Sequence, residues 1–374
     1  MKVLFAGGGT AGHINPALAI AGYLREQEPD AQILYIGAKG GMEERLVPAA
    51  GFDFKSITIS GFQRKLTWKN IKKNVKNVIY VFTASNESRR IIKEFQPDIC
   101  VGTGGYVAGP VIREAMKMGI PAIIHEQNAF PGVTNKMLAK RANKTMLAVA
   151  DARKYFDPSV KCVLTGNPVR QAVIRAQRGE ARKALGLDER PLILSFGGSL
   201  GARKINEAAA DLLVKSAKTD RYQHIHGYGQ WGGWFPDLLK EKGLDLAKHP
   251  NIDIREYIDN MPECLAAADL VICRAGAISL SELQAQGKAS ILIPSPNVAE
   301  NHQYHNAMAL VKHKAATIIE EKDLTGKSLC EKVEELFKTP ATITTLGNNA
   351  RKMAILNANE RIYKIIKEVL AVIR

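Results

Sequence analysis

Short apolar runs alternate with amphipathic stretches through the first half of the chain. KVLFAG (2–7), QILYIG (32–37), PDICVGTGG (97–105) and PAIIHEQN (121–128) each lead into glycine-rich or polar residues, as strands do before a turn. PALAIAGYLREQ (16–27) instead carries its apolar residues at helical spacing. Near-continuous apolar strands separated by helices are typical of a parallel sheet covered on both faces. The pattern therefore predicts an α/β domain at the N-terminus.

The same pattern restarts near residue 164. VLTGNPVR (163–170) precedes a charged helical stretch, and PLILSFGG (191–198) is again an apolar run that ends in glycines. HPNIDIREYI (249–258), ADLVICRAGA (268–277) and ASILIPSP (289–296) continue the series of predicted strands. A glycine turn after a strand thus occurs near the start of each half.

These patterns predict two similar α/β domains, 1–163 and 164–349. The chain has 374 residues, of which 46% are hydrophobic, which is enough to bury one core in each domain. A final amphipathic helix, at about 350–374, can pack back on the first domain.

Net charge and cysteine usage narrow the class of protein. A net charge of +15 favours anionic partners, although solubility alone also accounts for an excess of charge. The five cysteines form no C-x-x-C pair, so we expect neither a disulfide framework nor a structural zinc, and a reducing cytoplasm is favoured.

MKVLFAGGG does not read as a signal peptide, and no apolar run approaches the roughly 18 residues that cross a bilayer. Contact with a membrane is therefore expected only at its surface.

The first glycine turn is open to two interpretations. Gly7, Gly9 and Gly12 satisfy the G-x-G-x-x-G pattern of a dinucleotide site. The next predicted strand lacks the expected ribose-binding acid and is followed by Lys39, which weakens that interpretation. The turn also suits another anionic ligand, because glycines admit a close approach and helix N-termini favour negative charge. His13 stands where the loop becomes helix, either as a general base or as a capping or core residue.

The glycine turn of the second half can hold an anion. Ser199, between Gly198 and Gly201, offers a hydroxyl beside a backbone nest, and a simple tight turn remains the alternative. The next glycine turn, in VICRAGAISLSE, opens a helix whose first N–H groups can face a diphosphate. Ser279 and Glu282 fit a capping box there, but the Glu282 carboxylate could instead accept hydrogen bonds from a ribose.

A cluster of amide and imidazole side chains follows the last predicted strand. Asn301, His302, Gln303 and Asn306 offer the neutral donors and acceptors that sugar hydroxyls need. A solvated helix start would show the same residues.

Six segments in order resemble the motifs of one family. They are GGGTAGHINPALA (7–19), HEQNAFPG (125–132), TGNPVR (165–170), FGGSLGAR (196–203), CRAGAISLSE (273–282) and ENHQYHNA (300–307). They are similar to the MurG family of bacterial glycosyltransferases, family 28. The resemblance implies the GT-B fold, in which two Rossmann-like parallel-sheet domains face each other across a cleft and the donor sits mainly on the C-terminal domain.

The same resemblance implies a reaction. It is the inverting, metal-independent transfer of N-acetylglucosamine from UDP-GlcNAc to the C4 hydroxyl of the muramyl sugar of lipid I, an undecaprenyl-pyrophosphate lipid. The product is lipid II, no cofactor is used, and the enzyme works at the cytoplasmic face of the bacterial cell membrane. The expected partners are UDP-GlcNAc, lipid I, the anionic inner face of the membrane and other cell-wall and division proteins.

Site residues carry over by position. His13 matches the histidine proposed to assist the acceptor hydroxyl, with Glu126 and His125 as alternative bases. The residues expected to bind UDP-GlcNAc are Thr10, Ala11, Gly12, Asn128, Arg170, Ser199, Ile258, Ala277, Ile278, Ser279, Leu280, Ser281, Glu282 and Gln303. Within this set the resemblance implies that Arg170 approaches the diphosphate, the Ile258 backbone meets uracil and Glu282 holds the ribose.

Residues 64–82 combine a basic face with an apolar stripe. The residues expected to contact the membrane are Lys65, Trp68, Lys69, Lys72, Lys73 and Lys76. A basic amphipathic helix with a tryptophan suits an anionic interface, and the alternative is a helix packed on its own sheet.

Three other functions fit parts of the sequence. Another GT-B enzyme that makes glycolipids would share the fold and the donor helix, but HEQN and TGNPVR favour the peptidoglycan enzyme. An NAD-dependent oxidoreductase lacks its ribose-binding acid. A nucleic-acid-binding protein would explain the charge, but no recognised motif or interleaved aromatic platform supports one.

Overall fold

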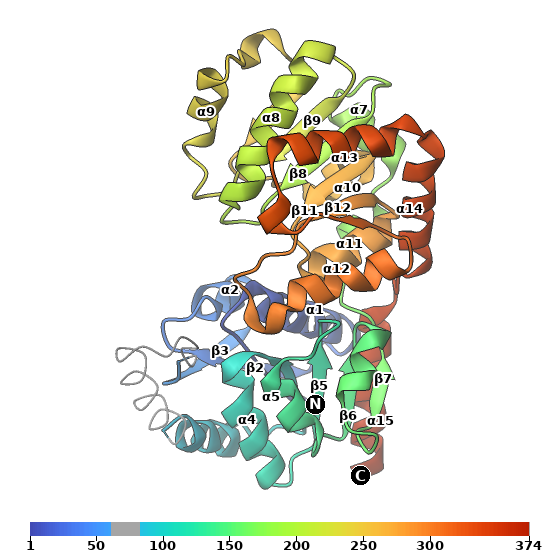
Figure 1. Cartoon of the computed structure of the whole chain (residues 1–374). Helices are drawn as coiled ribbons and strands as arrows, with labels where there is room; N and C mark the ends of the chain where they lie inside the picture. The colour runs from blue at the N-terminus through green and yellow to red at the C-terminus, as the bar shows by residue number, and fades with distance from the viewer. Residues whose placement is uncertain (61–82, 374) are drawn as a thin grey trace. The chain divides into compact units, whose positions relative to one another are not determined.

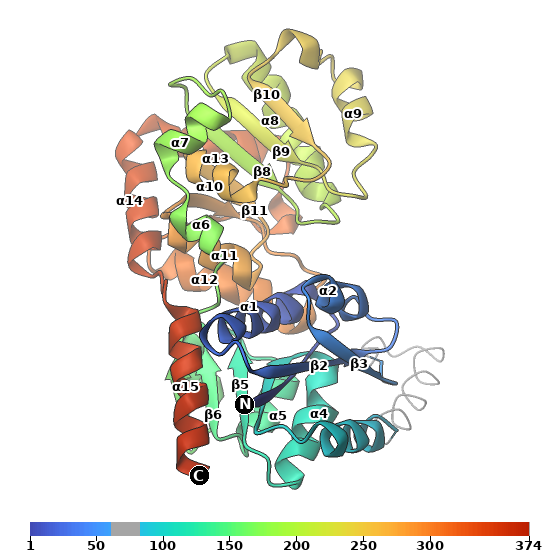
Figure 2. The same cartoon turned by 180° about the vertical axis from the view of Figure 1, so that it is seen from behind.

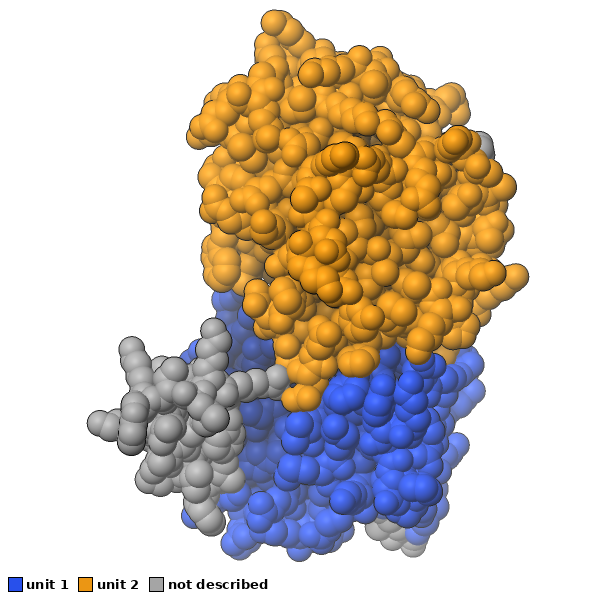
Figure 3. All heavy atoms as spheres, in the orientation of Figure 1, with its two compact units in different colours: residues 1–168, 357–374 blue, residues 169–356 orange. Residues whose placement is uncertain are grey.

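The computed structural model describes residues 1–60 and 83–373. The chain folds into two compact units (Figure 3). Unit 1 comprises Met1–Pro168 and Asn357–Arg374, and unit 2 comprises Val169–Leu356. The division falls a few residues after the predicted boundary, and the end of the chain belongs to unit 1.

Unit 1 is built on a parallel sheet with strand order β3-β2-β1-β4-β5-β6-β7. Its strands are β1 (Lys2–Gly7), β2 (Gln32–Ala38), β3 (Asp53–Ile57), β4 (Ile99–Gly104), β5 (Ala122–Glu126), β6 (Lys144–Leu147) and β7 (Cys162–Leu164). The chain runs outward from β1 to β3 and then returns to place β4 on the other side of β1. The switch in strand order between β1 and β4 is where open α/β sheets bind ligands, at the carboxyl ends of the strands.

Helices cover both faces of this sheet (Figures 1 and 2). They are α1 (Ala11–Gln27), α2 (Glu43–Ala49), the helical residues 83–95, α4 (Gly105–Lys117), α5 (Val133–Ala139), the short η1 (Ala150–Tyr155) and α15 (Ala358–Ile373). One face buries Ile112 of α4 and Ile92, whereas the other buries residues of α1 and α15, such as Leu24 and Ile366. Tyr23 of α1 meets Tyr363 of α15 edge to face, so the last helix closes the core of unit 1.

Unit 2 repeats this plan with strand order β10-β9-β8-β11-β12-β13, also parallel. Its strands are β8 (Leu192–Phe196), β9 (Gln223–Gly227), β10 (Ile252–Arg255), β11 (Leu270–Cys273), β12 (Ala289–Leu292) and β13 (Thr317–Ile318). The switch point lies between β8 and β11, and both strands lead into glycine turns. Each unit therefore presents a pair of glycine turns at the ligand-binding edge of its sheet.

The helices of unit 2 lie on both faces of its sheet. They are α6 (Gln171–Arg175), α7 (Arg178–Ala184), α8 (Arg203–Thr219), α9 (Phe235–Glu241), α10 (Met261–Ala267), α11 (Ala277–Gln286), α12 (His302–Lys312), α13 (Gly326–Lys338) and α14 (Pro340–Lys352), with short turns η2 (Leu246–Lys248), η3 (Ala299–Asn301) and η4 (Glu321–Asp323). Apolar residues of α10 and α11 fill the core on one face, and residues of α8 and α13 fill the core on the other.

The predicted fold class is confirmed: each unit is an α/β layer structure around a parallel sheet. The sequence reading missed four strands, β3, β6, β9 and β13. It also took VLTGNPVR as the opening of the second half, whereas β7 completes the first sheet beside β6. No helix among the described residues is long and apolar enough to cross a membrane.

Candidate functional site

The turn between β1 and α1 passes close to the end of β4. The Gly8 amide donates to the Gly104 carbonyl at 3.3 Å. A methyl group on Gly7 would collide with the Thr103 hydroxyl, and one on Gly8 would collide with the Glu43 carboxylate. The turn therefore requires glycine because side chains from neighbouring elements fill the space around its backbone.

His13 is the third residue of α1 and is partly buried above this turn. Its Nδ1 atom lies 3.2 Å from the Gly8 carbonyl oxygen and 3.1 Å from the Thr10 hydroxyl. A carbonyl oxygen can only accept, so this contact assigns the proton to Nδ1 and leaves a lone pair on Nε2. Burial lowers the pKa of His13, against the raising effects of the Gly8 hydrogen bond and the Glu43 charge. A neutral imidazole with a basic Nε2 is the form that a general base requires.

Thr10, Ala11 and Gly12 are exposed at the start of α1. Thr10 is the N-cap in extended conformation, and its carbonyl accepts from the amides of His13 and Ile14. The first turn contains no acidic residue. The loop and helix start thus form an exposed rim beside His13, and they offer it no negative side chain.

The two alternative bases are deeply buried. His125 is 0% exposed, its Nε2 lies 2.9 Å from the Gly166 carbonyl oxygen, and burial lowers its pKa to about 4. Glu126 is 1% exposed, and burial raises its pKa. Its carboxylate accepts from the amides of Asn128 and Gly132 at 2.9 and 3.1 Å. These contacts fix the β5–α5 loop that carries Asn128, and His13 is the most exposed of the three candidate bases.

In unit 2 the turn after β8 is also shaped by its surroundings. Gly201 has a φ of 85°, and a methyl group on it would collide with the Tyr228 carbonyl. Ser199 is exposed at the tip, where its carbonyl accepts from the Gln230 amide at 3.1 Å. Ser199 therefore lies exposed in a turn at the switch point of the sheet, a place where open α/β sheets bind ligands.

The helix that follows β11 begins three residues earlier than the capping-box interpretation requires. Gly276 is the N-cap of α11 without a side-chain cap, so Ser279 lies within the first turn and caps nothing there. The amides of Ile278 and Ser279 precede the first intrahelical hydrogen bond, which Leu280 donates to Gly276. Ser281 donates back to the Ala277 carbonyl at 3.0 Å. This end of α11 contains no acidic residue in its first turn, which suits an anion.

Glu282 and Arg170 form an ion pair in unit 2. The Arg170 Nε donates to Oε1 of Glu282 at 2.8 Å, and the Glu282 side chain is 9% exposed against 53% for Arg170. The sequence assigned these two residues to ribose and diphosphate without placing them in contact. Their pairing brings a guanidinium to the Glu282 carboxylate of α11. The alternative capping role of Glu282 is ruled out by the Gly276 N-cap.

Ile258 lies in the β10–α10 loop of unit 2, and Gln303 lies in the first turn of α12. The buried Ile258 side chain packs over Gly227 at the end of β9, which fixes the backbone of the β10–α10 loop. The Gln303 side-chain oxygen accepts from the Ser295 amide at 2.9 Å, which leaves its NH₂ group as donor. Asn306 donates to the Ala275 carbonyl at 3.2 Å and so ties α12 to the turn before α11.

Sequence reasoning missed several residues that hold these loops. Asn135 donates to Glu126 at 2.8 Å, and Asn206 donates to the Tyr228 carbonyl at 2.9 Å. Glu43 is fully buried beneath the first glycine turn. Asn206 and Glu43 lie outside the glycine motifs. The one signal that could have indicated them in the sequence is a polar residue at a position expected to be buried.

The residues proposed to contact the membrane lie outside the described residues; they are Lys65, Trp68, Lys69, Lys72, Lys73 and Lys76.

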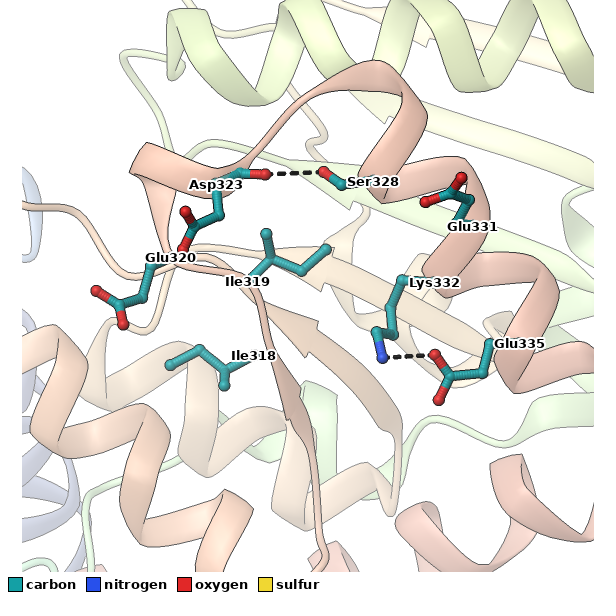
Figure 4. A pocket seen from close by; sticks show the side chains of 8 residues that line it. All are labelled: Ile318, Ile319, Glu320, Asp323, Ser328, Glu331, Lys332 and Glu335. Carbon is teal, nitrogen blue, oxygen red and sulfur yellow. Dashed lines mark hydrogen bonds and ion pairs between the residues drawn. The ribbon is translucent and has the colours of Figure 1, made fainter.

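A hollow of about 430 Å³ in unit 2 is lined by Glu320, Asp323, Glu331 and Glu335, among others (Figure 4). None of the predicted site residues lines this hollow, and its acidic side chains do not suit a diphosphate.

Within residues 1–60 and 83–373, no group of three or more His, Cys, Asp and Glu side chains is arranged to hold a metal ion.

Residues 3–147 match the glycosyltransferase family 28 N-terminal domain, and residues 192–369 match the glycosyltransferase family 28 C-terminal domain. A UDP-N-acetylglucosamine–N-acetylmuramyl-(pentapeptide) pyrophosphoryl-undecaprenol N-acetylglucosamine transferase of Acetivibrio thermocellus is 46% identical over 99% of this chain and 98% of its own length. A protein of the same name from Thermoanaerobacter sp. is 45% identical over 99% of this chain and its own full length.

A crystal structure of Acinetobacter baumannii MurG superposes with a TM-score of 0.78 at 30% identity, and it covers 98% of this chain and 99% of its own. The GT-B fold expected from the sequence motifs is confirmed by this likeness together with the two family models. This chain belongs to glycosyltransferase family 28 and, within it, to the MurG family.

Proposed function

We propose that this chain transfers N-acetylglucosamine from UDP-GlcNAc to the C4 hydroxyl of the muramyl sugar of lipid I and forms lipid II. The names of relatives that match almost the whole chain support these two substrates. The observation in the fold that carries the proposal is the start of α11, where the amides of Ile278 and Ser279 precede the first intrahelical hydrogen bond and Glu282, one turn on, pairs with Arg170. A nucleoside diphosphate needs this combination of anion donors and a ribose acceptor.

The donor binds to unit 2 in this proposal. The amides of Ile278 and Ser279 and the Arg170 guanidinium stabilise the diphosphate, while the Glu282 carboxylate accepts from the ribose. Ribose hydroxyls compete with Arg170 for Glu282, and this competition releases the guanidinium toward the phosphates. The Ile258 backbone meets uracil, and Gln303 reads the sugar.

His13 acts as the general base in unit 1. Its Nε2 takes the proton of the C4 hydroxyl as the oxygen attacks the anomeric carbon, and the bond from that carbon to the diphosphate oxygen breaks. UDP leaves with the bonding electron pair, and its added charge is stabilised by the start of α11. Attack opposite the leaving group inverts the anomeric centre. Stabilisation by amides and Arg170 serves the role that a divalent cation has in other transferases, so we propose that the reaction needs no metal.

The basic amphipathic segment 64–82 supports peripheral binding to the anionic inner face of the cell membrane, where lipid I is anchored. Other cell-wall and division proteins are proposed as partners because the chain belongs to the MurG family.

A transfer assay tests the reaction directly. Radiolabelled UDP-GlcNAc and a lipid I analogue should yield labelled lipid II, whereas UDP-glucose should transfer much more slowly. Activity should persist undiminished after dialysis against EDTA. No transfer to the lipid I analogue would overturn the substrate assignment, and loss of activity that Mg²⁺ restores would overturn metal independence.

A further inference from the structure

Glu43 is a buried carboxylate for which the reaction as described has no role. It is the first residue of α2, it is 0% exposed, and its Oε1 accepts from the Ala38 amide at 2.8 Å. Its Oε2 is buried and has no hydrogen-bond partner among the described residues. A carboxylate oxygen left unpaired inside a protein is costly, so the rest of its environment must account for it.

Three glycines surround this carboxylate. A methyl group on Gly8 or Gly37 would collide with the Glu43 side chain, and one on Gly41 would lie 2.7 Å from its carboxyl carbon. These glycines come from the β1–α1 turn, from β2 and from the loop before α2 (Figure 1). The backbone is therefore shaped around the carboxylate from three sides, and one of those sides is the turn that holds His13.

Gly8 connects Glu43 to His13. Its α-carbon faces the Glu43 carboxylate, and its carbonyl accepts from Nδ1 of His13 at 3.2 Å. The negative charge of Glu43 also acts on the imidazole through the protein interior and opposes the lowering of the His13 pKa by burial. In a water-poor surrounding, such a charge has more effect on its neighbours than it would have in solvent.

The other titratable groups around the turn are weaker candidates for this effect. Tyr35 of β2 donates its hydroxyl to the Gly7 carbonyl, and burial raises its pKa, so it stays neutral. Tyr106 of α4 packs its ring against Gly9, and burial raises its pKa as well. Glu126 of β5 reaches this region only through Asn135, whose amide lies near Gly104. Glu43 is thus the charged group that packs directly on the turn.

We propose that Glu43 is a positioning residue for the transfer reaction. Its charge and its packing against Gly8 hold His13 in the Nδ1-protonated form and stabilise the imidazolium that forms when Nε2 accepts the acceptor's proton. Glu43 touches no substrate and acts only through His13. This inference rests on the proposed role of His13 as the base.

The test compares two neighbouring glutamates of α2. Glu43→Gln keeps the shape and the hydrogen bond to Ala38 but removes the charge. The matched control is Glu44→Gln, because Glu44 is exposed and its carboxylate accepts from the Gly40 amide. The His13 titration is followed by NMR in the full chain with labelled histidine, and kcat/KM is measured against pH with UDP-GlcNAc and a lipid I analogue.

Glu43→Gln should move the His13 titration and the acidic limb of kcat/KM to lower pH, because the imidazolium loses its stabilising charge. The plateau kcat should fall about 10-fold, since the base becomes weaker. Glu43→Asp, which keeps the charge, should restore the limb toward its original pH even if it lowers the melting temperature, and Glu44→Gln should leave both readouts unchanged.

Two results overturn the inference separately from the proposed function. A His13 titration that is the same in Glu43→Gln and the parent shows that Glu43 does not act on His13, whatever happens to activity. A fall in kcat with an unmoved acidic limb shows a purely structural role for Glu43. Normal activity of His13→Ala would instead overturn the base, and the catalytic part of this inference with it.

Discussion

At the scale of single residues, the site depends on polar groups whose neighbours fix their chemical state. The contact of Nδ1 with the Gly8 carbonyl leaves His13 a basic Nε2, and burial lowers its pKa. Glu126, two strands away in the sheet, accepts from the amides of its own loop. Sequence motifs named both residues as candidate bases, and their different contacts are the reason we propose His13 and not Glu126.

Replacement of His13 tests its role. His13→Ala should lower kcat by about 10²- to 10⁴-fold, the usual contribution of a general base, because no other group takes up the acceptor's proton. UDP binding, measured by calorimetry, should stay within a factor of about two, since the proposed diphosphate contacts lie in unit 2. In the parent, kcat/KM should rise with pH through a midpoint below 6.5, because burial lowers the pKa of His13 and only the neutral imidazole is active. A variant with nearly normal kcat would remove His13 from the mechanism.

At the scale of elements, the glycine turns and the helices they open were predictable from the sequence, because apolar strands followed by glycines leave a strong local pattern. The strands that escaped prediction have weaker patterns. β9 reads QHIHG, and its two histidines are buried, although histidine is buried less often than aliphatic residues are. The sequence left two roles open for Glu282, because Ser279 and Glu282 also fit a capping box, and the Gly276 N-cap of α11 rules that box out. The Arg170–Glu282 contact joins residues distant in sequence, which no local pattern reports.

The start of α11 makes its own prediction. Ala277→Asp places a negative charge in the first turn, where it favours the helix but repels a bound diphosphate. The dissociation constant for UDP should rise about 10-fold or more, while the melting temperature should not fall. Ala277→Asn, which has nearly the same shape without the charge, should bind UDP much more tightly than the aspartate variant. Equal affinity of the two variants in calorimetry would separate the diphosphate from this helix.

At the scale of the whole molecule, the chain forms two compact units with the same plan, each with its own parallel sheet and cores on both faces. This doubling was predictable because the strand–turn–helix pattern restarts in the second half. The role of the last helix was open in the sequence. The apolar stripe of α15 packs in the same core as α1 of unit 1. Its residues Ile362 and Ile366 are fully buried there.

Buried histidines should make the stability of the chain depend on pH. Burial lowers the pKa of His224 and His226 to about 3 and that of His125 to about 4, against an ordinary value of 6.5. The unfolded chain therefore binds these protons first as the pH falls below 6.5, and the folded state loses stability from there down to the folded values. Each histidine should cost about 2 kcal/mol between pH 6.5 and pH 5.

Urea unfolding followed by circular dichroism at a series of pH values measures this loss. His226→Gln should flatten the dependence, although it also disturbs the contact of His226 with Ser195 and lowers stability at pH 7. A urea midpoint that stays constant from pH 7 to pH 5 would contradict the burial of these groups in their neutral form.

A crystal structure of the chain with bound UDP tests the account most directly. We predict that the diphosphate lies against the amides of Ile278 and Ser279, with the ribose hydroxyls on the Glu282 carboxylate and the Arg170 guanidinium turned toward the phosphates. UDP bound elsewhere, with the Arg170–Glu282 pair intact and the start of α11 vacant, would contradict it.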